Sequence, residues 1–352
     1  MSTPDQRLTV NELSAGVWVL AAPASALAPL APLLAARASL QPVLVLDQPV
    51  VEVLRDPAAY LPPDTAALVV VGPRRCGPRK MLPGLWVHDA TGKSVPVGWL
   101  PDITSRLAVF AEATARLLRR APSPASLAIL GQWEDRFSRV ALRTSRWFEK
   151  HSAHQTVFHW TADRVSRPDL VTGLQAGLGA AIYYGHGRAN GWAGYHGVRV
   201  ADFTVPWPEP LGALLALCCE NASRRGGRLS FAEELVLRGV CGGTIAAAGK
   251  SRHTDNRRLG PALCEVLTDR RNLTLASLIA SADLPEDFWK GTPYRFIGDP
   301  LAPLAAARDA TTKAAGIFAP APDEVLPAWS DMPQSLVRPL FDLKAHVGLN
   351  AV

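Results

Sequence analysis

Short apolar strands recur along this chain and alternate with stretches of helical periodicity. The first such runs cover residues 17–22, 43–47 and 67–72, and they are rich in Val and Leu. Strands that are apolar along their whole length are typical of parallel sheets covered by helices on both faces. A first unit is completed by two more predicted strands and a predicted helix, at 83–86, 95–100 and 103–119. The alternation predicts an α/β fold with a mostly parallel sheet.

The same alternation restarts after a Pro-Ser-Pro break at residues 122–124. The predicted strands of this second series are 127–130, 156–160, 180–184, 211–217 and 243–248, and the predicted helices are 136–151, 168–178, 231–238 and 257–268. This order predicts a doubly wound sheet with its chemistry at the strand ends. After residue 320, Pro and Ala become frequent and the periodicity fades. We therefore expect a smaller N-terminal α/β subdomain (1–122), a larger doubly wound subdomain (123–316) and a C-terminal appendage (317–352).

The charge pattern argues against nucleic acid as a partner. Lys and Arg number 37 against 31 Asp and Glu, for a net charge of +6, but the basic residues come in short pairs such as Arg224-Arg225. A nucleic-acid surface needs clustered basic residues. Residues 17–40 are apolar enough to suggest a membrane helix, yet three prolines interrupt them and favour a strand followed by a helix. We expect neither a nucleic-acid nor a membrane partner.

Cysteine usage indicates a reducing compartment. The chain has five cysteines, an odd number, and residues 1–10 do not have the charged-then-apolar pattern of a leader. The cysteines form no CxxC or CxxH pair, which argues against structural zinc. We expect a cytoplasmic protein without a metal or cofactor.

Two short segments carry residue types suited to one reaction. Residues 183–187 (Tyr-Tyr-Gly-His-Gly) and 217–221 (Leu-Cys-Cys-Glu-Asn) each follow an apolar run, so each can deliver a reactive side chain to the same edge of a sheet. A cysteine thiolate beside a histidine is a hydrolytic nucleophile. We expect His186 and Cys219 to form such a dyad, with the backbone N–H groups of Gly187 and Cys219 stabilising the oxyanion.

Simpler interpretations of these segments exist. Gly-His-Gly also occurs as an ordinary turn, and adjacent cysteines are usually buried core thiols. The segment from Gly185 to Gly187 also looks like half of a dinucleotide-binding fingerprint, but Asn190 stands where the third small residue is expected. No residue that orients His186 can be named from the sequence.

The second unit resembles the gingipain family of cysteine endopeptidases, which are relatives of the caspases, legumains and separases. The similarity is carried by residues 184–187 (Tyr-Gly-His-Gly), by Gly191-Trp192, and by Cys219-Glu220-Asn221, which resembles the family's Cys-x-Asn. In caspase-like relatives a small residue often precedes the nucleophile. Cys218 matches that small residue, and the resemblance therefore implies Cys219 as the nucleophile.

Further stretches resemble the family in the same order. They are 230–235 with 242–246, the loop 249–252, the Gly-Asp-Pro at 298–300, and residues 97–101, where Trp99 stands in place of the arginine of a Gly-Arg-x-Pro strand. The resemblance implies a caspase-like fold, a catalytic subdomain at 123–316, and cleavage of protein or peptide substrates through a thioester. The alternative is a catalytically silent scaffold that binds a regulatory protein partner.

The resemblance also implies candidate substrate-binding residues. Arginine-specific members of the family use a pocket acid upstream of the histidine segment, and Glu134 and Asp135 lie near the matching place. Asp135 is the better candidate for binding a basic residue before the scissile bond, although it could instead cap the helix that follows. Trp192 is expected either to cover the cleft or to pack beneath the loop, and Leu217 to line the cleft. The aromatic residue of the family's primary pocket has no clear counterpart in 253–258.

Two other polar residues have ordinary structural explanations. Asp299 lies in a Gly-Asp-Pro sequence, which favours a turn at the end of the last core strand. His196 lies in a loop close to His186, where a solvated or hydrogen-bonded histidine is the more common case.

Overall fold

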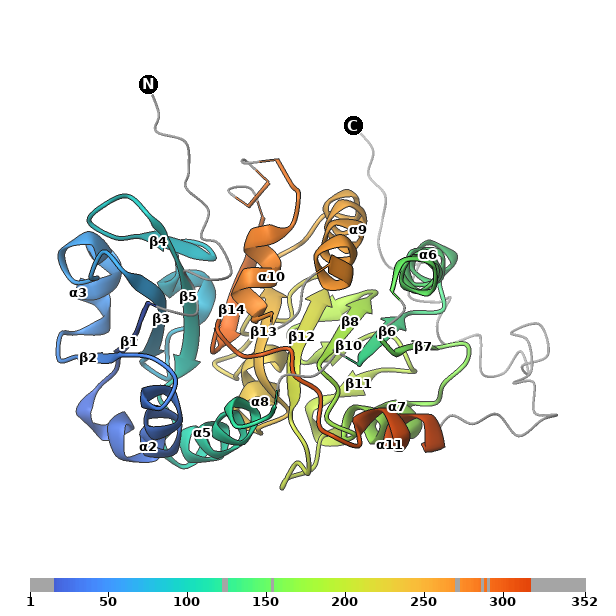
Figure 1. The fold of residues 1–352 in the computed structure, drawn as a ribbon, viewed down its shortest axis with the longest axis horizontal. Coiled ribbons are helices and arrows are strands. Elements are labelled where there is room, and N and C mark those ends of the chain that lie inside the picture. The colour runs from blue at the N-terminus through green and yellow to red at the C-terminus, as the bar shows by residue number, and fades with distance from the viewer. Residues whose placement is uncertain are drawn as a thin grey trace. The chain divides into compact units, whose positions relative to one another are not determined.

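One mostly parallel sheet forms the centre of the molecule, with helices on both of its faces (Figure 1). The computed structural model describes residues 16–121, 126–152, 155–269, 273–285, 288–289 and 292–317. In this part of the chain the sheet has eleven strands in the order β2-β1-β3-β5-β14-β13-β12-β8-β6-β7, with β4 paired to β5. The predicted class, a mostly parallel sheet covered on both faces, is confirmed.

The N-terminal series contains the strands predicted from the Val- and Leu-rich runs. Its strands are β1 (Val17–Ala21), β2 (Val43–Leu46), β3 (Thr65–Gly72), β4 (Trp86–His88) and β5 (Ser94–Pro101). Its helices are α2 (Ala24–Ala38), α3 (Val50–Arg55), α4 (Pro78–Met81) and α5 (Thr104–Leu118), with a short 3-10 turn at Pro57–Ala59. Every residue of β3 and β5 is buried, as expected for strands covered on both faces.

The second series follows the predicted order closely. Its strands are β6 (Leu127–Gly131), β7 (Val157–Thr161), β8 (Ala180–Tyr184), β12 (Leu211–Leu217), β13 (Cys241–Ala247) and β14 (Tyr294–Gly298). Its helices are α6 (Asp135–His151), α7 (Arg167–Leu174), α8 (Phe231–Leu237), α9 (His253–Asp269), α10 (Leu275–Ser281) and α11 (Ala310–Ile317). A separate small sheet is formed by β9 (Gly187–Arg188), β10 (Gly191–Trp192) and β11 (Val198–Arg199), and a 3-10 turn follows at Val200–Asp202.

Strand β14 joins the two series into one sheet. It runs parallel to β5, where Ile297 pairs with Trp99, and antiparallel to β13, where Ile297 pairs with Thr244. The described residues between 16 and 317 form one compact unit, so the expected boundary at residue 122 lies between two series of strands within one sheet. The expected appendage falls, after Ile317, outside the described residues.

A buried ion pair fixes the end of β14. Asp299 is fully buried, and its carboxylate lies 2.6 Å from Nη2 of Arg37 in α2. It also accepts from the indole N–H of Trp18 (3.3 Å) and from the backbone N–H of Leu301 (2.9 Å). Asp299 therefore links the last core strand to the N-terminal helix, in agreement with a structural role at this turn.

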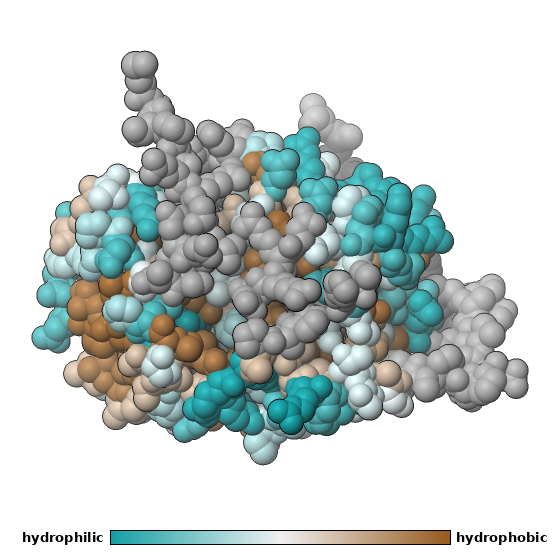
Figure 2. Space-filling view, viewed as in Figure 1, coloured by the Kyte–Doolittle hydropathy of each residue, from teal (hydrophilic) through white to brown (hydrophobic). Residues whose placement is uncertain are grey.

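The surface differs between the two sides of the molecule. Apolar side chains gather over the region of α2, β2 and α3, whereas hydrophilic side chains cover the region of α6 (Figure 2). The exposed large apolar residues include Leu40, Val45 and Val51 on the apolar side. Among the described helices, none combines the length and apolar character needed to span a bilayer.

Candidate functional site

Strands β8 and β12 are parallel neighbours, and their carboxyl ends meet at one edge of the sheet. Tyr184, the last residue of β8, pairs in register with Leu217, the last residue of β12. His186 follows two residues after the first strand and Cys219 two residues after the second. Because loops leaving the carboxyl ends of adjacent parallel strands lie side by side, both segments belong to one site.

The loop that carries His186 is held by backbone contacts. The N–H of His186 donates to Oε1 of the buried Gln132 side chain (2.8 Å). The carbonyl of His186 accepts from the N–H of Ala193 (2.9 Å) and from the hydroxyl of Tyr183 (3.1 Å). The backbone is therefore fixed, while 48% of the imidazole side chain stays exposed. In a dinucleotide-binding fold this loop would be followed by a helix. Here it is followed by strand β9, so the segment is not a dinucleotide-binding loop.

The turn that carries Cys219 is tight and tied to its surroundings. Glu220 has a φ of 61°, a left-handed conformation that is uncommon outside glycine, and its N–H donates to the carbonyl of Gly249 (2.9 Å). The next residue, Asn221, is fully buried, and its Nδ2 donates to the carbonyls of Arg188 (2.8 Å) and Gly191 (3.1 Å). Asn221 thus connects the cysteine turn to the histidine loop.

The two segments touch at Gly187. A Cβ added to Gly187 would lie 2.2 Å from the carbonyl oxygen of Cys219 and 2.6 Å from Sγ of Cys218. No other residue type fits this space without a backbone shift. Glycine at this position therefore permits the close approach of the two loops.

The adjacent cysteines have different surroundings. Cys218 is buried, its Sγ donates to Oδ1 of Asn221 (3.0 Å), and burial raises the pKa of its thiol well above the usual value. Cys219 is only partly buried, and its Sγ lies 3.5 Å from the carbonyl oxygen of Ser251 and 3.6 Å from the Ser251 hydroxyl. Within the described residues, the backbone N–H of Cys219 donates no hydrogen bond. Cys219 is the thiol of this pair that a reactant can reach.

A carboxylate and a guanidinium compete for one nitrogen of His186. Nε2 of His186 lies 3.2 Å from Oε1 of Glu134 and 2.5 Å from Nη2 of Arg136. Glu134 and Arg136 are themselves paired at 3.0 Å. Arginine can only donate, whereas a carboxylate can only accept, so Nε2 must be unprotonated toward Arg136 and protonated toward Glu134. The two contacts therefore correspond to different tautomers of the imidazole.

The pKa of His186 is lowered from its ordinary value. Partial burial is the largest cause, because it disfavours the charged imidazolium. The carboxylate of Glu134 acts in the opposite direction, whereas the positive charges of Arg136 and Arg188 lower the pKa further. A neutral imidazole is thus favoured, and Glu134 is the group that counters this effect.

A second histidine lies near the first. Phe137 presents its ring edge-on to His186, with centroids 5.1 Å apart, and likewise to His253, with centroids 5.6 Å apart. Burial, followed by the charges of Arg136 and Arg257, lowers the pKa of His253. His253 begins α9, in the connection after β13, and it was not expected at the site.

The two predicted pocket acids are both engaged by arginines of this chain. Asp135 is the first residue of α6, its side chain is 85% exposed, and its carboxylate pairs with Arg139 at 2.7 Å. It provides no side-chain cap to the helix. Glu134 contacts Arg136 and His186 instead of an open pocket. The structure therefore separates the two acids, with Glu134 at the imidazole and Asp135 toward solvent.

Trp192 and Leu217 lie beneath the site. Trp192 is fully buried, stacks on Tyr183 with centroids 4.3 Å apart, and donates its indole N–H to Oδ1 of Asn221 (2.7 Å). Of the two expected roles for Trp192, the structure shows packing under the loop. Leu217 is also fully buried, and its carbonyl accepts from Nδ2 of Asn256 (3.0 Å). Neither side chain has surface available for direct contact with a substrate, because both are fully buried.

Several residues at the site were not identified from the sequence. They are Gln132, Arg136, Phe137, Ser251 and His253. Their common signal is position, because the first three follow β6 and the last two follow β13, at the same sheet edge as β8 and β12. His196, in contrast, stacks on Trp133 with centroids 5.4 Å apart. The part of the chain that is described contains no cluster of His, Cys, Asp or Glu suited to a metal ion.

Comparisons with known proteins agree with this architecture. The sequence profile of peptidase family C25 matches residues 127–305, just over half of the chain. The structure of the Arg specific cysteine proteinase gingipain R (RgpB) gives a TM-score of 0.62 at 13% identity, covering 86% of this chain and 80% of that one. The complex of the pro- and mature domains of RgpB from Porphyromonas gingivalis gives 0.62 at 13% identity, covering 82% and 80%. A comparison with curated protein sequences finds no match. The expected caspase-like fold is thereby confirmed.

Proposed function

Because the chain belongs to peptidase family C25, we propose that it is a cysteine endopeptidase whose nucleophile is Cys219 and whose general base and acid is His186. The observation that carries this proposal is the contact of their two segments at Gly187, at the carboxyl ends of neighbouring strands. A partly buried thiol and a half-exposed imidazole on these segments are the two groups that thiol-dependent hydrolysis requires.

In the proposed reaction, the thiolate of Cys219 attacks the carbonyl carbon of the scissile peptide bond. A C–S bond forms, and the carbonyl electron pair moves onto oxygen, where the N–H groups of Gly187 and Cys219 stabilise it. Collapse of this intermediate breaks the C–N bond, and the imidazolium of His186 gives its proton to the leaving amine. Water then attacks the thioester carbonyl, the C–S bond breaks, and the carboxylic acid product and the thiol of Cys219 are released. The N–H of Cys219, which has no acceptor in the described residues, supports its assignment to the oxyanion.

Glu134 is proposed to orient His186 during this reaction. When Nε2 carries a proton and donates it to Glu134, Nδ1 is the nitrogen left to accept the proton of the thiol. Contact of Arg136 with the same Nε2 places the proton on Nδ1 instead, which prevents that acceptance. In the proposed active arrangement, Arg136 therefore pairs with Oε2 of Glu134 and does not contact the imidazole, which keeps Oε1.

We further propose that the substrates are proteins or peptides with a basic residue before the scissile bond. Asp135 is the acid available for such a residue, because Glu134 is engaged at the imidazole. The side chain of Asp135 is 85% exposed, and within the described residues its carboxylate pairs only with Arg139 on the same helix. Exposed pairs of this kind contribute little free energy, so a basic substrate side chain can replace Arg139.

The second candidate function is a catalytically silent scaffold that binds a protein partner. The observation that favours it is the 2.5 Å contact between Arg136 and Nε2 of His186, which corresponds to the unproductive tautomer. The two candidates differ in one measurable property, because only the peptidase needs a reactive thiol at Cys219.

The test uses a peptide acyloxymethyl ketone, a probe that labels a thiol after binding as a substrate. Intact-mass measurement should show one label per chain, located at Cys219 and lost in both Cys219→Ala and His186→Ala. The variant Cys218→Ala should keep labelling, because that thiol is buried. Cys76 is also partly buried, so labelling of Cys76 serves as the control for thiol reactivity that does not depend on the candidate site. Peptide hydrolysis should fall by about a thousandfold or more in Cys219→Ala.

Three outcomes distinguish the alternatives. Labelling of Cys218 in place of Cys219 would show that Cys218 is the nucleophile and that the proposed assignment to Cys219 is wrong. Equal labelling of Cys219 and Cys76 that ignores His186 favours the silent scaffold. Site-specific labelling without hydrolysis of any peptide indicates an activation requirement, such as a regulatory protein partner.

We also propose a cytoplasmic location. The five cysteines are free thiols in the structure, and a reducing compartment keeps thiols in this state. Thiol trapping in cell fractions measures both the location and the redox state of the chain.

A further inference from the structure

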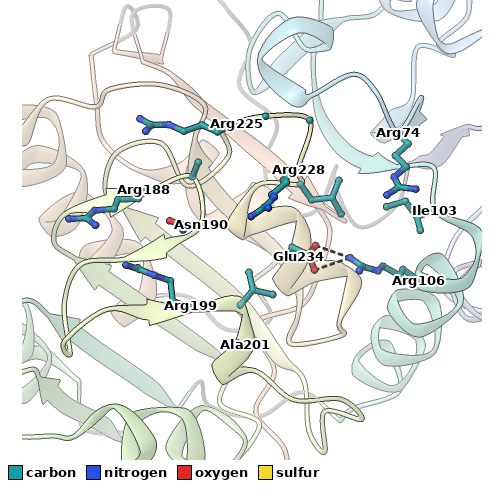
Figure 3. A pocket seen from close by; sticks show the side chains of 15 residues that line it. Arg74, Ile103, Arg106, Arg188, Asn190, Arg199, Ala201, Arg225, Arg228 and Glu234 are labelled. Atoms are coloured by element: carbon teal, nitrogen blue, oxygen red, sulfur yellow. Dashed lines mark hydrogen bonds and ion pairs between the residues drawn. The ribbon is translucent and has the colours of Figure 1, made fainter.

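A large pocket lined by arginines lies beside the site. Its volume is about 1190 Å³, and six arginines contribute to its lining: Arg74, Arg106, Arg188, Arg199, Arg225 and Arg228. The only acid among the lining residues is Glu234. Figure 3 shows the arginines distributed around the pocket, with Arg228 between Arg74 on one side and Arg199 on the other. The lining thus carries a strong excess of positive charge.

The single acid does not offset this charge. Both carboxylate oxygens of Glu234 accept from Nη1 of Arg106 at 2.8 Å, and one lies 3.4 Å from Nε of Arg238. Glu234 is therefore already paired with two arginines, of which one lines the pocket. The other five lining arginines have no carboxylate within the pocket wall.

Three of these arginines are free to bind an anion. In the residues that the structure describes, the guanidinium groups of Arg74, Arg188 and Arg228 make no hydrogen bond or ion pair, and all three residues are exposed. By comparison, Arg225 pairs with Glu220 (2.8 Å), and Arg199 donates to the carbonyl of Trp192 (3.2 Å). Several like charges held around one cavity without counter-charges create a potential that attracts anions.

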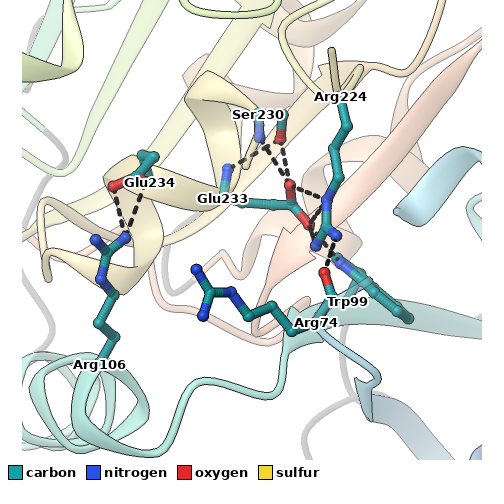
Figure 4. A network of polar contacts seen from close by, with 7 residues as sticks. All are labelled: Arg74, Trp99, Arg106, Arg224, Ser230, Glu233 and Glu234. Carbon is teal, nitrogen blue, oxygen red and sulfur yellow. Dashed lines mark hydrogen bonds and ion pairs between the residues drawn. The ribbon is translucent and has the colours of Figure 1, made fainter. Parts of the chain in front are cut away.

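The pocket wall is built from separate segments that are held in place. Arg224 binds the buried carboxylate of Glu233 through Nε and Nη2 and donates to the backbone carbonyl of Arg74, and Glu233 also accepts from Trp99 and Ser230 (Figure 4). This network joins the loop after β3 to the loop before α8. Two left-handed glycines, Gly226 and Gly227, with φ of 58° and 72°, form the turn between Arg225 and Arg228. The turn therefore places two arginines at the same pocket.

We propose that this pocket binds a compact polyanion carrying several phosphate groups. Guanidinium groups present planar forks of N–H donors that match phosphate oxygens in pairs. The arginines come from the loop after β3, from α5, from β9 and β11, and from the loop before α8, so their charges converge from several sides. A compact ligand with charges in several directions satisfies such an arrangement, whereas an extended acidic peptide presents its carboxylates along one line.

The pocket also adjoins both segments of the proposed dyad. Arg188 follows His186 by two residues, and Arg225 follows Cys219 by six residues and binds the intervening Glu220. A polyanion in the pocket therefore contacts both loops at once. Anion binding itself needs neither residue of the dyad, so it can be measured whether or not the chain is a peptidase.

The experiment is calorimetric titration of the full chain with sodium tripolyphosphate at low ionic strength. The pocket variant Arg74→Gln with Arg228→Gln removes two charges whose guanidinium groups make no hydrogen bond or ion pair within the described residues. The control variant Arg55→Gln with Arg143→Gln removes the same charge from exposed residues outside the pocket. We expect one tripolyphosphate per chain, binding weakened by about tenfold or more in the pocket variant, and a change of less than about twofold in the control.

A second variant guards against misfolding of the first. Arg228→Glu changes one exposed residue of the turn, and thermal unfolding of each variant should match that of the natural chain. Tripolyphosphate binding should be lost in Arg228→Glu. Equal weakening in the pocket and control variants, or no binding by the natural chain, would overturn the proposal. Tighter binding of a hexaglutamate peptide than of tripolyphosphate would overturn the assignment of a compact phosphate-bearing ligand.

Discussion

The α-carbon of Gly187 lies so close to Cys219 that an added methyl group would come within 2.2 Å of the Cys219 carbonyl oxygen. This contact is the point at which the histidine loop and the cysteine turn meet. Asn221 reinforces it through hydrogen bonds to two carbonyls of the histidine loop. The geometry of the proposed dyad thus depends on a position that has no side chain.

The first prediction concerns this position. Gly187→Ala forces the two loops apart, because the opposing atom is backbone and cannot rotate away. A displacement of about 1 Å between two reacting groups lowers kcat/KM by about a hundredfold, and we expect a loss of this order or more. Peptide hydrolysis measures the effect. Gly84→Ala is the control, since the nearest atoms to its added methyl lie 3.9 Å away. Equal activity in both variants contradicts the proposed importance of the contact.

The second prediction concerns the charges on His186. Arg136→Gln should raise the pKa of His186, because it removes a positive charge next to Nε2, and Glu134→Gln should lower it, because it removes the countering carboxylate. NMR titration of histidine-labelled chain follows both changes. Arg139→Gln removes a charge that pairs with Asp135 instead, and should leave the His186 pKa nearly unchanged. Shifts in the same direction for the Glu134 and Arg136 variants are incompatible with the described competition.

The third prediction concerns substrate preference. Asp135→Asn should lower kcat/KM for a peptide with arginine before the scissile bond by about tenfold relative to a peptide with alanine there. Arg139→Gln should act in the opposite direction, because it frees the Asp135 carboxylate. The ratio of the two kcat/KM values is the measurement. Asp56→Asn, an exposed acid in the N-terminal series, serves as control. An unchanged ratio in both Asp135→Asn and Arg139→Gln excludes Asp135 as the determinant.

The fourth prediction concerns the buried carboxylate of Glu233. Glu233→Gln leaves the largely buried Arg224 without its counter-charge, which should lower the free energy of unfolding by about 3 kcal/mol or more. Glu234→Gln is the matched control, because its partner Arg106 is 40% exposed and the expected loss is about 1 kcal/mol or less. Urea denaturation gives both values. Similar losses in the two variants would show that burial does not distinguish these ion pairs.

Periodicity predicted most of the sheet, and the order of the motifs predicted the family. Local patterns failed where tertiary contacts decide the outcome. The predicted strand at 83–86 is found at Trp86–His88, where it pairs antiparallel with β5, and helix α10 was not predicted at all. Strand β14 has only five residues, and its place between β5 and β13 depends on partners far away in the chain.

The candidate site shows the same division. Residues 183–187 and 217–221 could be paired from the sequence because strand ends of a doubly wound sheet share an edge. The neighbours of His186 could not, because the sequence does not reveal which of Glu134, Asp135 and Arg136 turns inward at the start of α6. The partners of Glu233 could not be predicted either, because Trp99, which donates its indole N–H at 2.7 Å, and Arg224 both lie outside its local sequence.

The position of β14 has a consequence for biosynthesis. During translation the first five strands leave the ribosome long before residues 294–298, so the part of β5 that pairs with β14, at Gly98 and Trp99, stays unpaired while most of the chain is still being made. Exposed strand edges of this kind promote aggregation of incomplete chains. The sheet around β5 is therefore incomplete until β14 has been synthesised. Truncated products that end before β14 are expected to need chaperones or to be degraded.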